Sequence, residues 1–291
     1  MSRVAYVNGR YVRHAEAAIH IEDRGYQFSD GIYEVTAIWK GRPVDLEGHW
    51  VRLERSLREL EIAMPMSVKA LTVVARETVR RNMVRDGILY TQVTRGVAPR
   101  NHLFPANTPP ALVMTARNNP NTGGAAAERG IKVISQPDIR WGRRDIKTVS
   151  LLPNAIAKQR AHEQGASETF LYTPDGIVTE CSSSNAWMVS KEGTLVTRPL
   201  SNDILGGITR QRLIQIAKEA GIPVEERSFT LEEAKEAREL FLSSTTNFCM
   251  PIVQLDETVI GNGHPGGVTT DLRSKYLDFL DTLEGPVWYG R

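Results

Sequence analysis

The sequence predicts a mixed α/β (α+β) fold made of two domains. Segments with the apolar periodicity of strands alternate along the chain with segments that have the periodicity of helices. Near the middle, the polar stretch 118–124 combines a proline with two glycines, which is typical of a linker. A chain of 291 residues is long enough for two ordinary domains. We therefore expect an N-terminal domain over residues 1–118, a linker over 119–125 and a C-terminal domain over 126–291.

The N-terminal domain is expected to begin with a β-hairpin. Asn8 and Gly9 separate two short apolar runs, and this dipeptide favours the tight turn of a hairpin. Ser67 is a suitable N-cap for a helix, because its hydroxyl can accept a hydrogen bond from the first turn. The expected elements after the hairpin are strands at 32–39, 88–94 and 111–115 and helices at 47–62 and 67–84.

The C-terminal domain is expected to combine several strands with helices. Pro153 suits the first turn of a helix that runs to about residue 164, and Gly221 suits the end of a helix over 209–220. Turn sequences at 174–176 and 191–193 divide residues 168–198 into short runs, which predicts a meander of strands. The other expected elements are strands at 131–135, 223–228, 239–243 and 249–255 and a helix at 269–282.

The composition is that of a soluble globular protein, with 41% apolar and 24% charged residues. A net charge of +2, from 36 basic and 34 acidic residues, does not indicate a nucleic-acid or membrane surface. Two cysteines suit a reducing compartment. The N-terminus lacks the apolar core of a signal peptide, and no stretch approaches the length of a membrane span. We expect a cytoplasmic enzyme or binding protein.

Lys147 has surroundings unlike those of an ordinary surface lysine. It lies between Ile146 and Thr148 and closely follows Arg143 and Arg144. Partial burial and neighbouring positive charge both disfavour an ammonium ion, and the neutral amine is the nucleophile of Schiff-base chemistry. The alternative is a lysine in a basic surface loop, and this segment alone leaves that alternative open.

Two further segments are suited to hold an anion such as a phosphate. Gly206 and Gly207 precede a predicted helix that begins near Ile208 and Thr209. Glycines let the backbone approach an anion closely, and a helix N-terminus offers unpaired N–H groups. The hydroxyl-rich segment 243–246 ends a predicted strand and can bind phosphate or carboxylate. Simpler interpretations are a flexible loop with a threonine N-cap and an ordinary turn.

Glu180 is an acidic residue within the small, polar segment 179–185, which follows the apolar pair Ile177-Val178. A buried carboxylate at this position requires a cationic partner. The pyridine nitrogen of a cofactor would supply one, and an arginine elsewhere in the chain would serve as the alternative.

Other motifs give no support for nucleotide or metal sites. Residues 261–266 have the glycine spacing of a dinucleotide fingerprint, but too few residues follow the next helix to provide the strand that a βαβ unit requires. We interpret this segment as a tight turn. The chain has no Gly-Lys dipeptide of the Walker type, and its six histidines are scattered, so no metal site is expected.

Five motifs occur in an order and spacing that resemble those of the class IV pyridoxal-phosphate transaminases, from about residue 4 to residue 282. They are His49-x-x-Arg52-Leu53, Asp145-Ile146-Lys147, the segments 179–185 and 207–210, and Ser244-Thr245-Thr246. The resemblance implies the two-domain fold type IV, with a smaller N-terminal α/β domain and a larger C-terminal pseudo-barrel domain. It also implies pyridoxal 5′-phosphate as the cofactor.

Two segments resemble the D-amino acid branch of this family. Residues 28–34 are similar to the segment that carries a substrate-facing tyrosine, here Tyr33. Residues 94–102 are similar to the loop that supplies an Arg-x-His pair, here Arg100 and His102. In the family this pair reaches over from the neighbouring subunit, so the resemblance implies a homodimer that acts on D-amino acids and 2-oxo acids.

The resemblance also implies a role for each remaining site residue. Lys147 would hold the cofactor as a Schiff base and carry the proton, while Glu180 would face the pyridine nitrogen. Arg52 would pair with the phosphate. The other implied cofactor-binding residues are Leu205, Ile208, Thr209 and Thr245, and the substrate-binding residues are Tyr33, Arg100, His102, Ser244 and Thr246.

Three alternatives remain at this point. Within the family, a branched-chain L-amino acid transaminase or an amine transaminase has the same cofactor motifs. A nicotinamide oxidoreductase would depend on residues 261–266 alone. A binding protein without a cofactor would use Lys147 and Glu180 as a structural ion pair.

Overall fold

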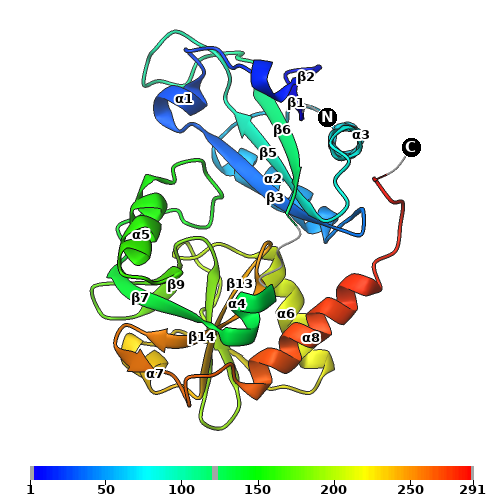
Figure 1. Ribbon diagram of the computed structural model, residues 1–291. Helices are drawn as coiled ribbons and strands as arrows, with labels where there is room; N and C mark the ends of the chain where they lie inside the picture. The colour runs from blue at the N-terminus through cyan, green and yellow to red at the C-terminus, as the bar shows by residue number, and fades with distance from the viewer. Residues whose placement is uncertain (1–2, 120–123, 290–291) are drawn as a thin grey trace. The chain divides into compact units, whose positions relative to one another are not determined.

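The computed structural model describes residues 3–119 and 124–289, and the chain divides into two compact units (Figure 1). The first unit comprises residues 1–120, 146–150 and 283–291, and the second comprises residues 121–145 and 151–282. The domains predicted at 1–118 and 126–291 stay a prediction. Residues 120–123 of the predicted linker lie outside the described residues.

The described part of the first unit is built on a six-stranded antiparallel sheet, in which β3, β5 and β6 lie side by side (Figure 1). The strand order is β2-β1-β6-β5-β3-β4. The strands are β1 (Val4–Val7), β2 (Arg10–Arg13), β3 (Gly31–Trp39), β4 (Arg42–Pro43), β5 (Gly87–Thr94) and β6 (Ala111–Asn118).

Two amphipathic helices form one core with this sheet. Leu53 and Leu57 of one helix and Leu71 and Val79 of the other are buried in a cluster that includes Leu89 of β5. The side chain of Ser67 caps the second helix by accepting a hydrogen bond from the backbone N–H of Ala70. The helical segments of this unit are η1 (His14–Glu16), a 3-10 helix, and the α-helices α1 (Arg24–Phe28), α2 (Leu46–Glu59) and α3 (Val68–Arg81).

The described part of the second unit contains a nine-stranded mixed sheet. Its order is β12-β11-β10-β13-β14-β7-β8-β9, with β15 paired to β14. The strands are β7 (Ile131–Pro137), β8 (Glu168–Tyr172), β9 (Val178–Cys181), β10 (Asn185–Val189), β11 (Leu195–Thr197), β12 (Val224–Glu226), β13 (Glu239–Ser244), β14 (Phe248–Leu255) and β15 (Thr258–Val259).

Helices cover this second sheet, and its largest core cluster includes Phe170, Phe229 and Leu242. Contacts join α8 to β13 and β14, and α5 to β7 and β8 (Figure 1). The helices are α4 (Gly124–Arg129), α5 (Leu152–Glu163), α6 (Ile208–Glu219), α7 (Leu231–Lys235) and α8 (Gly267–Asp281).

The predicted mixed α/β fold is confirmed, as are most of its elements. The first hairpin turns at Asn8 and Gly9, both with positive φ, as a tight hairpin turn requires. Pro153 lies in the first turn of α5. The short helices α1, α4 and α7 were not predicted, because each is too short to show a helical period in its sequence.

The predicted meander over 168–198 is wrong in its strand pairing. Two antiparallel hairpins form, β8 with β9 and β10 with β11, but β13, β14 and β7 lie between them in the sheet. Strand β10 pairs with β13, which is distant in sequence, and β7 and β8 are parallel. Local turn signals show where strands begin and end, whereas their partners depend on contacts distant in sequence.

The interpretation of residues 261–266 as a tight turn is confirmed, with Gly261 and Gly263 both at positive φ. Helix α8 begins immediately afterwards, and its N-terminus is already occupied. The Glu239 carboxylate accepts hydrogen bonds from the backbone N–H groups of Val268 and Thr269 at 3.0 and 2.8 Å. A nucleotide phosphate cannot use the same N–H groups, so this finding argues against the nicotinamide alternative.

Within residues 3–119 and 124–289, no helix is both long and apolar enough to cross a membrane. The same residues contain no cluster of three or more His, Cys, Asp or Glu side chains that could hold a metal ion.

Candidate active site

Lys147 lies on a short segment that extends the sheet of the first unit beside β3. The Tyr33 N–H donates to the Lys147 carbonyl at 2.9 Å, and Thr148 forms a bridge with Ile32. Ile146 and Thr148 are buried, so Lys147 between them points to the opposite side. Its Nζ lies 4.3 Å from the centroid of the Tyr33 ring. The structure thus brings together Lys147 and Tyr33, which the sequence assigned to cofactor and substrate.

The expectation that Arg143 and Arg144 leave positive charge in the Lys147 segment is wrong. Arg143 donates to both carboxylate oxygens of Asp145 at 3.0 Å. Arg144 Nη1 donates to Asp203 at 2.9 Å. Both guanidinium charges are offset by carboxylates within the second unit, whereas Lys147 belongs to the first. The half-buried setting of Lys147 comes instead from its strand-like pairing and the Tyr33 ring.

Arg52 is held by a buried carboxylate that sequence reasoning did not assign. Its Nε and Nη2 donate to the two oxygens of Glu34 at 2.8 and 2.7 Å. His49 Nδ1 lies 2.7 Å from one of these oxygens. Glu34 is on the buried face of β3, so the strand's alternation carried a signal for it. Arg52, the predicted phosphate ligand, is therefore fixed in orientation.

Burial and charged neighbours together determine the ionisation of Glu34 and His49. Burial on its own would raise the pKa of Glu34, but Arg52 and His49 together lower it to about 2. Burial lowers the pKa of His49, so the neutral ring donates to Glu34. The Glu34 carboxylate is therefore ionised at neutral pH.

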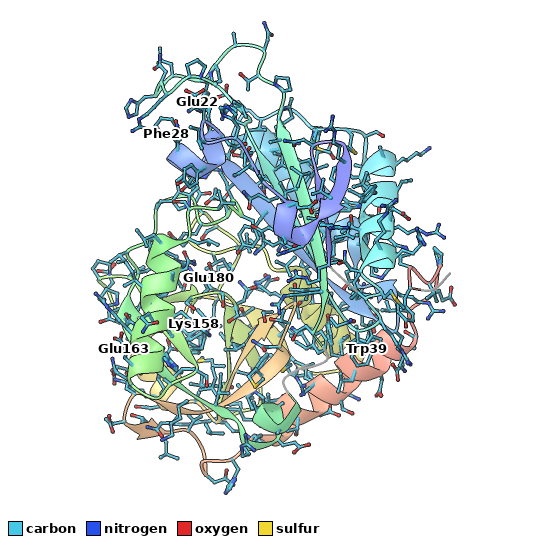
Figure 2. The ribbon with its side chains drawn as sticks, turned by 45° about the horizontal axis from the view of Figure 1, so that its top comes forward. Glu22, Phe28, Trp39, Lys158, Glu163 and Glu180 are labelled. Carbon is cyan, nitrogen blue, oxygen red and sulfur yellow. The ribbon has the colours of Figure 1, made fainter. Side chains whose placement is uncertain are left out.

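The predicted pair Arg100 and His102 lies around the ring of Phe28, which Figure 2 labels. The Arg100 guanidinium is 4.7 Å from the Phe28 centroid, and the His102 ring centroid is 5.4 Å from it. Arg24 anchors the loop by donating to the Asn101 carbonyl at 2.5 Å. Arg100 and His102 are both exposed in the single chain, close to the same aromatic ring and available to a ligand.

The base of this loop is buried and charged, which sequence reasoning missed. One oxygen of Asp30 accepts from Arg24 Nε and from Arg95 Nε, each at 2.7 Å. Arg95 also donates to the carbonyls of Glu61 and Leu60 at 2.9 and 2.6 Å. These contacts fix the loop at one end and leave its polar tip exposed.

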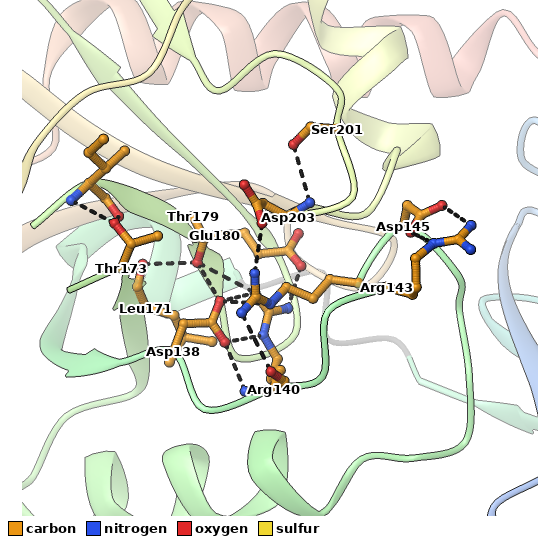
Figure 3. Close-up of polar contacts among 12 residues, drawn as sticks. Asp138, Arg140, Arg143, Asp145, Leu171, Thr173, Thr179, Glu180, Ser201 and Asp203 are labelled. Carbon is orange, nitrogen blue, oxygen red and sulfur yellow. Dashed lines mark hydrogen bonds and ion pairs between the residues drawn. The ribbon is translucent and has the colours of Figure 1, made fainter. Parts of the chain in front are cut away.

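Glu180, in β9 of the second unit, is buried, and three donors reach its carboxylate; Figure 3 shows Arg140, one of the three, beside it. Arg140 Nη1 donates to its Oε1. Asn185 Nδ2 and the Leu205 N–H donate to its Oε2 at 3.0 and 3.1 Å. Burial raises the pKa of Glu180, although Arg140 and the Leu205 N–H act in the opposite direction.

The sequence left open whether Glu180 would pair with an arginine or with a cofactor, and the structure shows the arginine. A carboxylate has about four lone-pair positions, and the described residues fill three of those on Glu180. One more donor, such as a protonated ring nitrogen, can still be accepted. The observed pairing with Arg140 therefore fits a pyridoxal ring at this position and does not require one.

The start of α6 is built for close approach to an anion. Gly207 is the N-cap residue and has no side chain of its own to cap the helix. Asn185 joins this start to Glu180, because its Nδ2 also donates to the Leu205 carbonyl at 2.9 Å. With Gly206 and Gly207 before it, the start of α6 suits a phosphate.

The hydroxyl-rich segment belongs to the same part of the second unit. Ser243 pairs with Asn185 across β13 and β10. The following turn contains Thr245 and Thr246, which are half-buried, and the Ser244 hydroxyl accepts from the Asn247 N–H at 3.2 Å. Strand pairing and hydrogen bonds therefore join the segments of the second unit that carry the predicted residues. They are Glu180, Leu205, Ile208, Thr209, Ser244, Thr245 and Thr246.

Comparison with known proteins decides the family. The sequence model described as "Amino-transferase class IV" matches residues 31–255. The chain belongs to the class IV aminotransferases. A D-alanine aminotransferase from Listeria innocua is 40% identical, over 98% of this chain and 99% of the relative. A D-alanine aminotransferase from Bacillus licheniformis is 41% identical, over 92% and 93%.

Solved class IV aminotransferases have the same fold. A branched-chain aminotransferase from the archaeon Thermoproteus uzoniensis, solved with norvaline, superposes with a TM-score of 0.86. It is 26% identical, and the match covers 96% of this chain and 95% of that one. As a class IV aminotransferase, the protein is an enzyme that transfers amino groups.

Replacing Gly207 by alanine tests the start of α6. A Cβ there would lie 2.1 Å from Asn185 Oδ1, so Asn185 would have to move away from Glu180 and Leu205. Gly207→Ala should lower the free energy of unfolding by about 1–3 kcal/mol and weaken pyridoxal phosphate binding. Gly267→Ala, at the start of α8, is the matched control, because a Cβ there would meet nothing within 4 Å. Urea denaturation and cofactor titration measure both effects, and equal behaviour of the two variants would contradict the account.

The pair of Glu34 and Arg52 predicts a pH-dependent contribution to stability. The pKa of Glu34 is about 2 in the folded protein, against 4.5 for an ordinary glutamate. Because the folded pKa is lowered, the contribution is complete above about pH 4.5 and is lost as the pH falls toward about 2.

Glu34→Gln should therefore cost about 3 kcal/mol of unfolding free energy at neutral pH. The difference from the wild type should shrink below about pH 4.5. Urea unfolding at several pH values measures it. Glu54→Gln, on the exposed side of α2, is the control and should change stability by less than about 0.5 kcal/mol. A Glu34 difference that does not vary with pH would refute the assignment.

Proposed function

We propose that the protein transfers the amino group of D-amino acids to 2-oxo acids, using pyridoxal 5′-phosphate. The observation that carries this proposal is the anchored loop that presents Arg100 and His102 beside Phe28. Two cationic or polar side chains held together in this way suit one substrate carboxylate. Sequence identity of 40% and 41% to two D-alanine aminotransferases, over nearly the whole chain, also supports D-amino acids as the substrates.

The branched-chain alternative has weaker support. Its solved relative from Thermoproteus uzoniensis shares the fold at 26% identity, against 40% for the D-alanine aminotransferase from Listeria innocua. A shared fold at this lower identity does not favour the L-amino acid substrate.

Bound pyridoxal phosphate supplies an electron-withdrawing ring that stabilises negative charge at the substrate Cα. The residues of this chain determine how that chemistry proceeds. With the cofactor bound, the Lys147 amine would hold it and would move the Cα proton. Glu180 would keep a proton on the ring nitrogen. Arg52, oriented by Glu34, contributes its charge to the phosphate together with the start of α6.

Substrate recognition uses residues of both predicted binding segments. Tyr33, Arg100 and His102 bind the α-carboxylate, and Ser244 and Thr246 contribute hydroxyl groups. Arg100 and His102 are exposed in the single chain, which suits a pair that serves the site of a second copy. We include a homodimer in the proposal for this reason.

Borohydride reduction tests the role of Lys147. Reduction of the loaded enzyme should fix the cofactor to the peptide that contains Lys147, as mass spectrometry can show. Lys147→Ala should lose at least about a thousandfold in kcat, since it removes both the nucleophile and the base. Lys158→Ala is the control, because Lys158 is half exposed and pairs with Glu168. A label on Lys158 would refute the assignment.

Substrate stereochemistry tests the D-amino acid proposal. D-alanine should donate its amino group to 2-oxoglutarate, whereas L-alanine and L-leucine should be poor donors. Arg100→Ala should reduce kcat/KM for D-alanine by about ten- to a hundredfold through the lost carboxylate contact, with the cofactor spectrum unchanged. Arg117→Ala, also exposed in the first unit, is the control. Faster transfer from L-leucine than from D-alanine would place the enzyme in the branched-chain branch.

A further inference from the structure

Glu180 ends a chain of alternating charges in the second unit (Figure 3). Arg140 lies next to it, followed by Asp138, Arg144 and Asp203. Arg198 completes the chain through a contact of 2.7 Å with Asp203. None of these side chains except Glu180 has a part in the proposed reaction.

Asp138 holds Arg140 in a fixed orientation. Arg140 Nε and Nη2 donate to the two oxygens of Asp138 at 2.9 and 2.7 Å. The Thr179 hydroxyl donates to Asp138 at 2.7 Å, and the Arg140 N–H donates to it at 3.1 Å. The Asp138 side chain is only 1% exposed. The guanidinium is therefore clamped by Asp138, and its remaining nitrogen, Nη1, donates to Glu180.

The contact between Asp138 and Arg140 affects the basicity of the Glu180 carboxylate. A guanidinium in direct contact makes a carboxylate a weaker base, and a weaker base is less able to keep a proton on a pyridine nitrogen. Asp138 divides the charge of Arg140 between two carboxylates. The inner group of Glu180, Arg140 and Asp138 carries one net negative charge, which a protonated ring would balance.

The outer group of Arg144, Asp203 and Arg198 carries one net positive charge, but it is closer to solvent. Asp203 is 39% exposed, and Arg144 and Arg198 are each 12% exposed, against 8% and 1% for the Arg140 and Asp138 side chains. The group also lies beyond Asp138, which Arg144 contacts at 3.3 Å, and is therefore further from Glu180 than Arg140 is. Water screens exposed charges more than buried ones, so the outer group affects Glu180 less.

We propose that Asp138 is a positioning residue that keeps Glu180 basic by neutralising Arg140, and this inference rests on the role proposed for Glu180. Asp138 is not a catalytic residue in this proposal, since it acts through Arg140 and Glu180. Its effect should appear in the protonation of the ring nitrogen and in kcat, more than in KM.

The test uses enzyme loaded with pyridoxal phosphate that carries ¹⁵N in the ring, since the ¹⁵N shift reports protonation directly. The wild type should give the signal of a protonated nitrogen. Asp138→Asn should move that signal toward the unprotonated value and lower kcat roughly tenfold, the factor that corresponds to one pKa unit, with KM changed less than about twofold. Asp203→Asn is the matched control, and its signal should stay close to that of the wild type.

A double variant separates the electrostatic role from a purely structural one. In Asp138→Asn/Arg140→Gln both charges are removed, so the net charge around Glu180 is again that of the wild type. The ¹⁵N signal should return toward the wild-type value. If Asp138 only held the local structure, removing a second contact would move the signal further away. This variant also decides the question if Asp138→Asn fails to fold because of its unbalanced arginine.

Glu180→Gln distinguishes failure of this inference from failure of the proposed function. If Glu180→Gln shifts the signal and Asp138→Asn does not, the inference is overturned and the role of Glu180 stands. If Glu180→Gln leaves both the signal and kcat unchanged, the role of Glu180 and the inference are overturned together.

Discussion

The burial of the Glu180 carboxylate is the constraint on which the second unit depends. Taking a carboxylate out of water costs several kcal/mol unless charged and polar partners replace the lost hydration. Three partners come from different parts of the chain: Arg140 after β7, Asn185 at the start of β10, and Leu205 before α6. Their positions require β9, β10 and the loop before α6 to converge, and this convergence also sets the start of α6.

The first unit also buries a carboxylate against an arginine. Glu34 is buried in β3 and is paired with Arg52 through two hydrogen bonds. In the second unit the two-bonded fork of Arg140 meets Asp138, and a single nitrogen of the same guanidinium reaches Glu180. A fork with two bonds fixes orientation as well as charge. The chain has 9 lysines among 36 basic residues, and this preference for arginine suits buried pairs of this kind. Polar groups fixed before the substrate binds need little reorganisation during the reaction.

Local signals in the sequence predicted the elements well. The Asn8-Gly9 turn, the Ser67 N-cap and Pro153 in the first turn of α5 all depend on residues close in sequence. The pairing of β10 with β13, and of residues 146–150 with β3, depends on residues far apart and was not predicted. Sequence periodicity cannot report such pairs, because many registers satisfy the same pattern of burial.

The candidate site shows the same division. Lys147 and Glu180 were predicted from their motifs, whereas Arg140, 40 residues from Glu180, carried no local signal. Glu34 could have been found, since the alternation of β3 places it on the buried face and a buried acid needs a partner. Arg24, Asp30 and Arg95 hold the loop of Arg100 and His102 through contacts between distant segments, which no local pattern encodes.

A crystal structure of the enzyme with pyridoxal phosphate bound tests the central claim most directly. The claim is that Lys147 and Glu180 act on the same cofactor while Glu180 keeps its contact with Arg140. The account predicts continuous density between Lys147 Nζ and the cofactor and a Glu180 oxygen within hydrogen-bond distance of the ring nitrogen. Attachment of the cofactor to another lysine, or a ring nitrogen that faces a group other than Glu180, would contradict it.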